Sequence, residues 1–143
     1  MSVIVVDASV AAKWLLPAGG ETLAEEAFHL LGRWAIGEIR MIVPDLFWAE
    51  LGNLLWKAVR QGRCAKVAAE VALASLEEGM LTTVSSLVLL DRAFGIANTF
   101  GRTVYDSLYV ALALESEGQL ITADEKLANA LAARLPVKWL GAV

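Results

Sequence analysis

The chain has 143 residues and a formal net charge of −4 at pH 7, and hydrophobic residues make up 57% of it. This composition excludes a disordered segment, and the length is typical of one domain, so we expect residues 1–143 to form a single domain. Cys64 and His29 are each the only residue of their type. Intrachain disulfides and zinc sites made of several cysteines or histidines are therefore excluded.

The sequence pattern predicts neither a membrane span nor a secretory signal. No apolar run reaches the roughly 18 residues that cross a bilayer, because charged residues or glycines interrupt each run. Residues 1–4 lack the charged region and the cleavage site of a signal peptide. We therefore expect a cytoplasmic protein that does not bind a membrane.

Along the chain, short β-branched runs alternate with longer segments in which apolar residues recur with helical period. The first run is apolar on both faces, which is typical of a buried parallel strand. Strands are predicted in chain order at residues 3–6, 41–43, 81–84, 102–104, 120–122 and 137–140. Helices are predicted at residues 9–16, 21–36, 45–60, 65–78, 86–100, 107–117 and 125–134. This alternation predicts an α/β fold, with a parallel sheet covered on both faces.

Two of the helices carry further local signals. The second is predicted to begin with a capping box formed by Thr22 and Glu25. His29 falls off the apolar stripe of this helix, which indicates a histidine that faces solvent. The helix at 107–117 is apolar nearly all round, so we expect it to lie in the interior.

Acidic residues stand where the predicted strands end. In open α/β sheets, reactive groups gather beyond the carboxyl ends of the strands. Asp7 follows the first strand, Asp124 follows the strand at 120–122, and Asp106 stands at the start of the buried helix. Aspartate is also a favoured N-cap, which explains any one of them without a function. Capping alone accounts less well for three acids at one edge, so we predict that they lie together.

Glu50 is a fourth candidate and comes from the helix at 45–60. At about 100° per residue, the apolar positions of this helix form a core stripe, and Glu50, Asn53 and Lys57 share a face that borders it. A glutamate in this position is commonly only solvated. Beside three aspartates, however, it completes a cluster of four carboxylates.

Four carboxylates in one cleft repel one another unless a cation compensates them or some of them hold protons. Oxygen ligands without histidine or cysteine select Mg²⁺ or Mn²⁺, and these ions commonly also bind a phosphate oxygen. The natural chemistry of such a site is the hydrolysis of a phosphoester. The residues that we predict to form this catalytic metal site are Asp7, Glu50, Asp106 and Asp124.

Four segments carry a family resemblance: residues 5–9 (VVDAS), 44–53 (PDLFWAELGN), 105–113 (YDSLYVALA) and 120–127 (LITADEKL). With these segments the chain resembles the PIN-domain ribonucleases of the VapC toxin type. The resemblance implies a three-layer α/β/α PIN domain with a central, mostly parallel sheet. It also implies an enzyme, an Mg²⁺-dependent endoribonuclease toxin that cuts RNA, often tRNA or rRNA, and arrests translation.

The same resemblance implies roles and partners. The four acids are expected to form the metal site, with supporting polar groups at Ser9, Asn53 and Thr122. A homodimer is implied, together with a cognate VapB antitoxin whose C-terminal segment occludes the site. Five tryptophans and a mean hydropathy of +0.57 independently favour an apolar surface for a dimer or a partner.

Four cations form a basic cluster after Glu50: Lys57, Arg60, Arg63 and Lys66. The negative net charge argues against a broad basic surface, but a local cluster can still contact RNA phosphates. Its alternative role is to complement the macrodipole at the end of the helix at 45–60.

Two other functional classes remain open. A haloacid-dehalogenase-like phosphatase also begins with a strand and an aspartate, but it requires a second acid at the position of Ser9. A non-catalytic partner-binding module agrees with the apolar composition. It leaves the four carboxylates unexplained.

Overall fold

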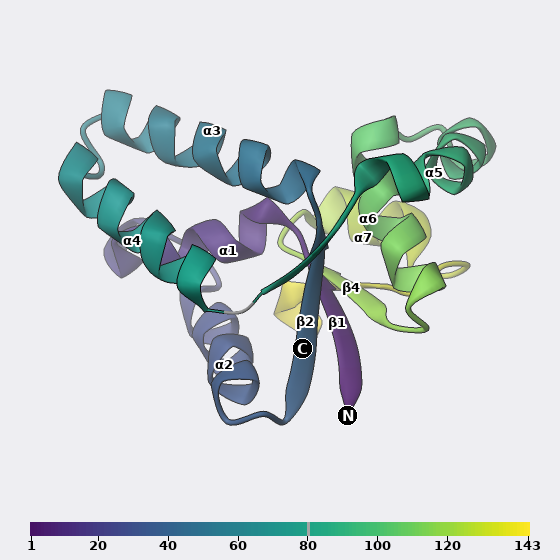
Figure 1. The fold of residues 1–143 in the computed structure, drawn as a ribbon, viewed down its shortest axis with the longest axis horizontal. Coiled ribbons are helices and arrows are strands. Elements are labelled where there is room, and N and C mark those ends of the chain that lie inside the picture. The colour runs from purple at the N-terminus through teal and green to yellow at the C-terminus, as the bar shows by residue number, and fades with distance from the viewer. Residues whose placement is uncertain (80) are drawn as a thin grey trace.

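The computed structural model describes residues 1–79 and 81–143, except for the side chain of Ala18. In this part of the chain, five strands form one sheet in the order β3-β2-β1-β4-β5, and every neighbouring pair is parallel (Figure 1). The strands are β1 (Ser2–Val6), β2 (Ile39–Pro44), β3 (Thr82–Val84), β4 (Gln119–Thr122) and β5 (Val137–Trp139). The predicted parallel sheet is confirmed.

Helices cover both faces of this sheet. The α-helices are α1 (Ala8–Leu15), α2 (Ala24–Ala35), α3 (Leu46–Arg60), α4 (Lys66–Glu78), α5 (Ser86–Phe100), α6 (Val104–Glu115) and α7 (Glu125–Leu131), and the 3₁₀ helices are η1 (Ala18–Gly20) and η2 (Leu140–Ala142). Helices α1 to α4 lie on one side of the strands and α5 to α7 on the other (Figure 1), so the predicted three-layer arrangement is confirmed. Among the described residues, no helix combines the length and the apolar character that crossing a membrane requires.

The core extends over both faces of the sheet, and α6 contributes much of it on one face. Val5 and Val6 of β1 and Val110 and Ala111 of α6 have no exposed surface. Helix α6 packs against β1, β2, β4 and α5. Full burial of one valine side chain stabilises the fold by about 1.5–3 kcal/mol. The interior position that the apolar sequence of this helix predicts is confirmed.

The start of α2 differs from the prediction. Its first residue is Ala24, and the preceding Leu23 adopts φ +58° with no side-chain cap. Thr22 and Glu25 therefore form no capping box, because the chain enters the helix through a left-handed residue instead of an extended one. His29 of the same helix is exposed, as predicted.

The predicted strand at 102–104 is also wrong. Thr103 caps α6 instead, because its hydroxyl accepts a hydrogen bond from the Asp106 amide at 3.1 Å. Helix α6 consequently begins at Val104, earlier than predicted. Asp106 lies inside its first turn, so this acid is held by the helix backbone rather than by a preceding strand.

Gly118 sets the close approach of β4 to β1. A β-carbon at this position would lie 2.6 Å from the carbonyl oxygen of Val3, which is closer than real atoms approach. The next residue, Gln119, pairs with Ile4 of β1. Only glycine allows this register, and the register brings Thr122 to the carboxyl end of β1.

Candidate active site

Two of the predicted acids lie at the same edge of the sheet. Asp7 follows β1, Asp124 lies just beyond β4, and these strands are parallel neighbours. Asp7 accepts a hydrogen bond from the Val10 amide at 3.3 Å, and Asp124 accepts one from the Leu127 amide at 3.2 Å. Both acids are N-caps, of α1 and α7, so capping and a position at the sheet edge coincide in the same residues.

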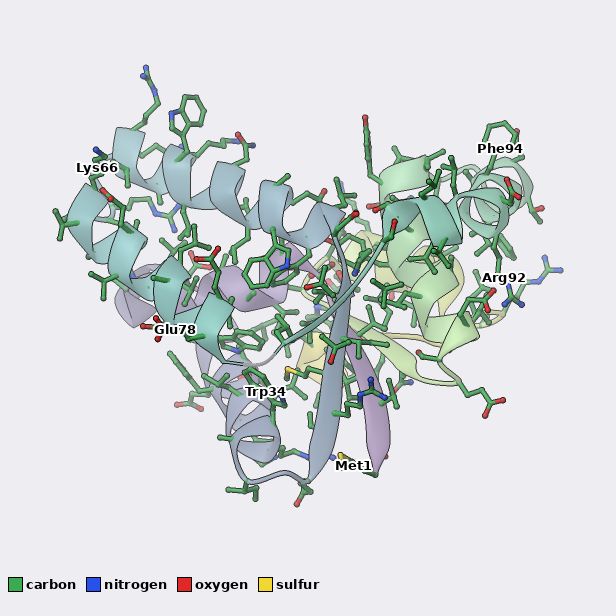
Figure 2. The ribbon with its side chains drawn as sticks, viewed as in Figure 1. Met1, Trp34, Lys66, Glu78, Arg92 and Phe94 are labelled. Atoms are coloured by element: carbon green, nitrogen blue, oxygen red, sulfur yellow. The ribbon has the colours of Figure 1, made fainter. Side chains whose placement is uncertain are left out.

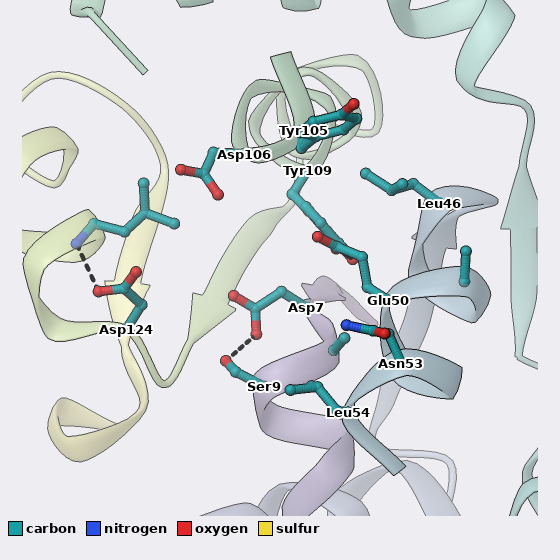
Figure 3. Close-up of a pocket in the computed structure, with 13 residues that line it drawn as sticks. Asp7, Ser9, Leu46, Glu50, Asn53, Leu54, Tyr105, Asp106, Tyr109 and Asp124 are labelled. Carbon is teal, nitrogen blue, oxygen red and sulfur yellow. Dashed lines mark hydrogen bonds between the residues drawn. The ribbon is translucent and has the colours of Figure 1, made fainter. Parts of the chain in front are cut away.

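Both carboxylate oxygens of Asp7 accept hydrogen bonds from hydroxyl groups. Ser9 Oγ donates to Oδ1 at 2.5 Å (Figure 3), and Thr122 Oγ1 donates to Oδ2 at 2.5 Å. Thr122 has no exposed surface, and its Oγ1 also accepts from the Asp124 amide at 3.0 Å. Burial raises the pKa of Asp7 to about 6, although these hydrogen bonds oppose the increase.

Glu50 of α3 is held by Tyr109 of α6. Tyr109 Oη donates a hydrogen bond to Glu50 Oε1 at 2.5 Å. Burial raises the pKa of Tyr109, and the hydrogen bond to Glu50 raises it further. The hydroxyl therefore keeps its proton at neutral pH and fixes the orientation of the glutamate.

Asp106 lies in the first turn of α6 and has one charged partner. Arg102 Nη2 lies 3.4 Å from Asp106 Oδ2, and the two side chains are 27% and 34% exposed. A partly exposed ion pair of this length constrains a carboxylate only weakly. Asp106 is therefore held less firmly than Asp7.

The four acids line one pocket of about 450 Å³. Figure 3 shows their side chains arising from different elements around a common space. We call this space the acidic pocket, and its polar lining is Asp7, Ser9, Glu50, Asn53, Tyr105, Asp106, Tyr109 and Asp124. Thr122 reaches the pocket through its hydrogen bond to Asp7.

The acidic pocket has the donor chemistry of a hard cation site and an open geometry. Carboxylate and amide oxygens are the ligands that Mg²⁺ prefers, and the pocket lining contains no histidine or cysteine. Among the described residues, no three histidine, cysteine, aspartate or glutamate side chains are grouped closely enough to hold a metal ion. The donor set fits Mg²⁺ or Mn²⁺, and binding requires the carboxylates to approach one another.

Most of the chain, including the acids of the pocket, matches the model of a known protein family. The model of the "PIN domain" matches residues 4–131, which include all four acids. The chain belongs to the PIN-domain family. Strand β5 lies beyond the matched range, yet it pairs with β4 in the same sheet.

Known relatives place this PIN-domain protein among the VapC proteins. Ribonuclease VapC3 from Pyrobaculum aerophilum is 36% identical over 128 residues, which cover 88% of this chain and 92% of that protein. The crystal structure of PAE2754 from the same organism matches with a TM-score of 0.70 at 25% identity, covering 99% of this chain and 85% of that one. A toxin-antitoxin complex from Klebsiella pneumoniae matches with a TM-score of 0.62 at 14% identity, over 94% and 95%, and shows the shared fold.

The structure divides the basic cluster that the sequence suggests. Lys57 and Arg63 line a second pocket, which adjoins the acidic pocket. Arg60 instead lies over a tryptophan ring, 5.3 Å from its centre. Lys66, at the outer end of α4 in Figure 2, pairs with Glu70 at 3.7 Å. The four cations are therefore not equivalent.

Two residues that contact acids of the pocket through their side chains were not predicted as site residues from the sequence: Tyr109, which donates to Glu50, and Arg102, which pairs with Asp106. Tyr109 lies three residues after Asp106, a spacing that places both side chains on one helix face. Arg102 lies four residues before Asp106, the usual spacing of a helical ion pair. The mistaken strand at 102–104 hid this second signal.

Proposed function

We propose that this PIN-domain protein is a metal-dependent endoribonuclease that hydrolyses RNA phosphodiesters as the toxin of a VapBC-type pair. The observation that carries the proposal is the acidic pocket, where carboxylates from distant segments line one space of about 450 Å³. Like charges gathered in one pocket oppose folding, so their presence supports a catalytic role. The name of the VapC3 relative, a ribonuclease, supports RNA as the substrate.

Mg²⁺, or Mn²⁺ in its place, is the proposed cofactor. When bound, the ion supplies Lewis-acid chemistry, which shields phosphate charge and makes water a better nucleophile. The residues proposed to hold it are Asp7, Glu50, Asp106 and Asp124, all of which line the acidic pocket.

The chain's own contribution is to present two of these carboxylates, Asp7 and Glu50, in fixed directions. Ser9 and Thr122 direct the two oxygens of Asp7 by donating one hydrogen bond to each. Tyr109 directs Glu50 by donating a hydrogen bond to Oε1, so Oε2 accepts no hydrogen bond from Tyr109. Such fixed groups lower the barrier because they need no reorganisation when charge develops on the phosphate.

The target and the partner follow from the family resemblance. We propose tRNA or rRNA as the substrate and arrest of translation as the consequence of its cleavage. A VapB-like antitoxin is the proposed partner, and its C-terminal segment is proposed to cover the acidic pocket. Binding of a purified antitoxin is then expected to inhibit RNA cleavage.

Residues 1–143 are proposed to act as one domain that assembles as a homodimer. Leu87, Val88 and Phe94 are exposed apolar residues of α5, and Phe94 lies at the periphery of the molecule in Figure 2. Large apolar side chains exposed along one helix favour contact with a second copy. Light scattering is expected to report about twice 15.3 kDa, and a strict monomer at tens of micromolar contradicts the dimer.

The direct test is RNA cleavage by the purified protein in Mg²⁺ and in EDTA. We expect cleavage in Mg²⁺, loss in EDTA, and loss in Mg²⁺ for Asp7→Asn. Asp91→Asn is the matched control, because Asp91 is exposed on α5 and lies outside the acidic pocket. Cleavage that persists in EDTA contradicts metal dependence, and full cleavage by Asp7→Asn contradicts the catalytic assignment. Antitoxin binding without any cleavage favours a non-catalytic partner-binding module.

A further inference from the structure

The second pocket lies directly beside the acidic pocket. Its volume is about 400 Å³, and the two pockets share Ser9, Leu54 and Asp124 in their linings. Three cations, Lys13, Lys57 and Arg63, also line the second pocket, which we therefore call the basic pocket. The proposed chemistry of the acidic pocket gives none of these three cations a role.

On two neighbouring helices, an acid of the acidic pocket is followed along the chain by a polar residue and then by a lysine of the basic pocket. Helices α1 and α3 lie side by side (Figure 1). The two series are Asp7, Ser9, Lys13 along α1 and Glu50, Asn53, Lys57 along α3. At about 1.5 Å per residue, the cations lie about 9–10.5 Å from the acids along the helices. This separation corresponds to roughly three steps of a stacked polynucleotide strand, at about 3.4 Å each.

Glu21 engages two of the three cations and leaves the third unpaired. Its Oε1 lies 3.4 Å from Lys13 Nζ, and its Oε2 accepts a hydrogen bond from Arg63 Nη2 at 2.6 Å. Lys13 is only 7% exposed, so its ammonium requires an anionic partner. In the described part of the chain, Lys57 has no ion-pair partner within 4.0 Å. The basic pocket therefore retains positive charge for a further anion.

We infer that the basic pocket binds a phosphate of the RNA backbone a few nucleotides from the phosphodiester at the acidic pocket, an inference that rests on the proposed function. Lys57 offers an unpaired ammonium, and Arg63 has more N–H donors than its contact with Glu21 uses. Hydrogen bonds from such cations to phosphate oxygens are strong because both partners are charged. Glu21 is a positioning residue that places Lys13 and Arg63, and its carboxylate competes with the incoming phosphate.

Other cations of the basic cluster distinguish a built pocket from diffuse attraction. Arg60 and Lys66 come from the same stretch of chain and carry the same charge, but neither lines the basic pocket. If attraction is diffuse, the loss of affinity depends only on the number of cations removed. If the phosphate binds in the pocket, the loss of affinity depends on which cation is removed. Single alanine variants at Lys57, Arg63, Arg60 and Lys66 therefore form a charge-matched set.

The test measures the affinity of inorganic pyrophosphate by calorimetry and of a short single-stranded RNA by fluorescence anisotropy, both in EDTA to prevent cleavage. Lys57→Ala and Arg63→Ala are each expected to weaken both ligands about tenfold, the loss typical of a hydrogen bond to a charged group. Each is also expected to reduce the salt slope of RNA binding by about 0.7. Arg60→Ala and Lys66→Ala are expected to change pyrophosphate affinity by less than about twofold.

Glu21→Gln is expected to change pyrophosphate affinity in the opposite direction to Lys57→Ala and Arg63→Ala. Removal of the competing carboxylate is expected to tighten pyrophosphate binding, whereas loss of a merely structural residue weakens it. Equal weakening of ligand binding by all four alanine variants overturns phosphate binding in the basic pocket, but it does not contradict RNA cleavage by the wild-type protein. Selective weakening by Lys57→Ala and Arg63→Ala supports the pocket even if the wild-type protein cleaves no RNA. If Glu21→Gln fails to fold, as its melting curve will show, the alanine comparison still decides.

Discussion

The two sides of the acidic pocket hold their carboxylates in different ways. On one side, Asp7 accepts a hydroxyl donor at each oxygen, and Glu50 accepts from a buried tyrosine. On the other side, Asp106 has Arg102 at 3.4 Å, and Asp124 is exposed. We call Asp7 and Glu50 the fixed side and the other two acids the open side.

This difference indicates how the acidic pocket can bind an ion although its carboxylates lie too far apart to hold one together. Holding a carboxylate in a buried place costs desolvation, and the raised pKa of Asp7 reports that cost. The open side avoids the cost because water still solvates it. We expect the fixed side to set the position of the cation and the open side to close around it.

The largest expected effect is on RNA cleavage. Asp7→Asn and Asp106→Asn each remove an anionic ligand while keeping the shape, so both are expected to lower the rate about a hundredfold or more. The affinity for Mg²⁺ is expected to fall with the rate, and Asp91→Asn is expected to behave as the wild type. Full activity in Asp106→Asn would break the comparison, because the fixed side would then suffice.

Stability without metal is expected to depend on pH through the fixed side. Because burial raises the pKa of Asp7 to about 6, the folded protein binds this proton more tightly than the unfolded chain, whose value is 3.8. Between about pH 4 and pH 6 the folded state holds more protons, so the stability from Asp7 is present below this range and falls as pH rises through it. The shift of about two units corresponds to at most about 3 kcal/mol.

Thermal unfolding in EDTA measures this effect. Asp7→Asn is expected to match or exceed the wild-type melting temperature at neutral pH and to lose that advantage near pH 4. The difference between the two proteins isolates Asp7 from the other carboxylates. A loss of about 1 kcal/mol that is the same at every pH would show that Asp7 acts only as a helix cap.

A smaller effect is expected from the partners of the carboxylates. Tyr109→Phe removes the donor to Glu50 and keeps the ring, so cleavage at limiting Mg²⁺ is expected to fall about tenfold, with partial recovery at high Mg²⁺. Arg102→Gln is expected to cost only a few-fold, because its ion pair is partly exposed. If Arg102→Gln has the larger effect in kinetic assays, the assignment of fixed and open sides is reversed.

The smallest effect concerns the helix that carries Asp106. Thr103→Ala removes the N-cap of α6 and is expected to lower the free energy of unfolding by about 1 kcal/mol, measured in urea. Thr103→Ser keeps a hydroxyl and serves as the matched control. Equal stability of the two variants would contradict the cap.

Local signals predict much of the fold and of the acidic pocket. The alternation of runs predicts the parallel sheet, because strand and helix periods are local properties of the sequence. Asp7 and Asp124 are predictable for the same reason, since each follows a strand and also caps the next helix. Thr103 shows where local signals fail: a β-branched residue suits both a strand and an N-cap, and only the position of α6 decides between them.

Contacts between distant segments could not be predicted in this way. Thr122 donates to Asp7 across 115 positions, and Tyr109 donates to Glu50 across 59. Neither pair shares a helix face or a strand, so no periodicity connects its members. Their contact depends on the register of β4 against β1 and on the packing of α6 against the sheet.

The sequence by itself determined the fold class and which acids stand at the carboxyl edge of the sheet, because caps, breaks and periodicity are read within a few residues. Only the tertiary structure decided which carboxylates are fixed and which are open. It also separated Lys57 and Arg63 from Arg60 and Lys66, and brought Lys13 beside the first two. The physical reason is that distances between side chains on different elements are set by how α1, α3 and α6 pack around the sheet.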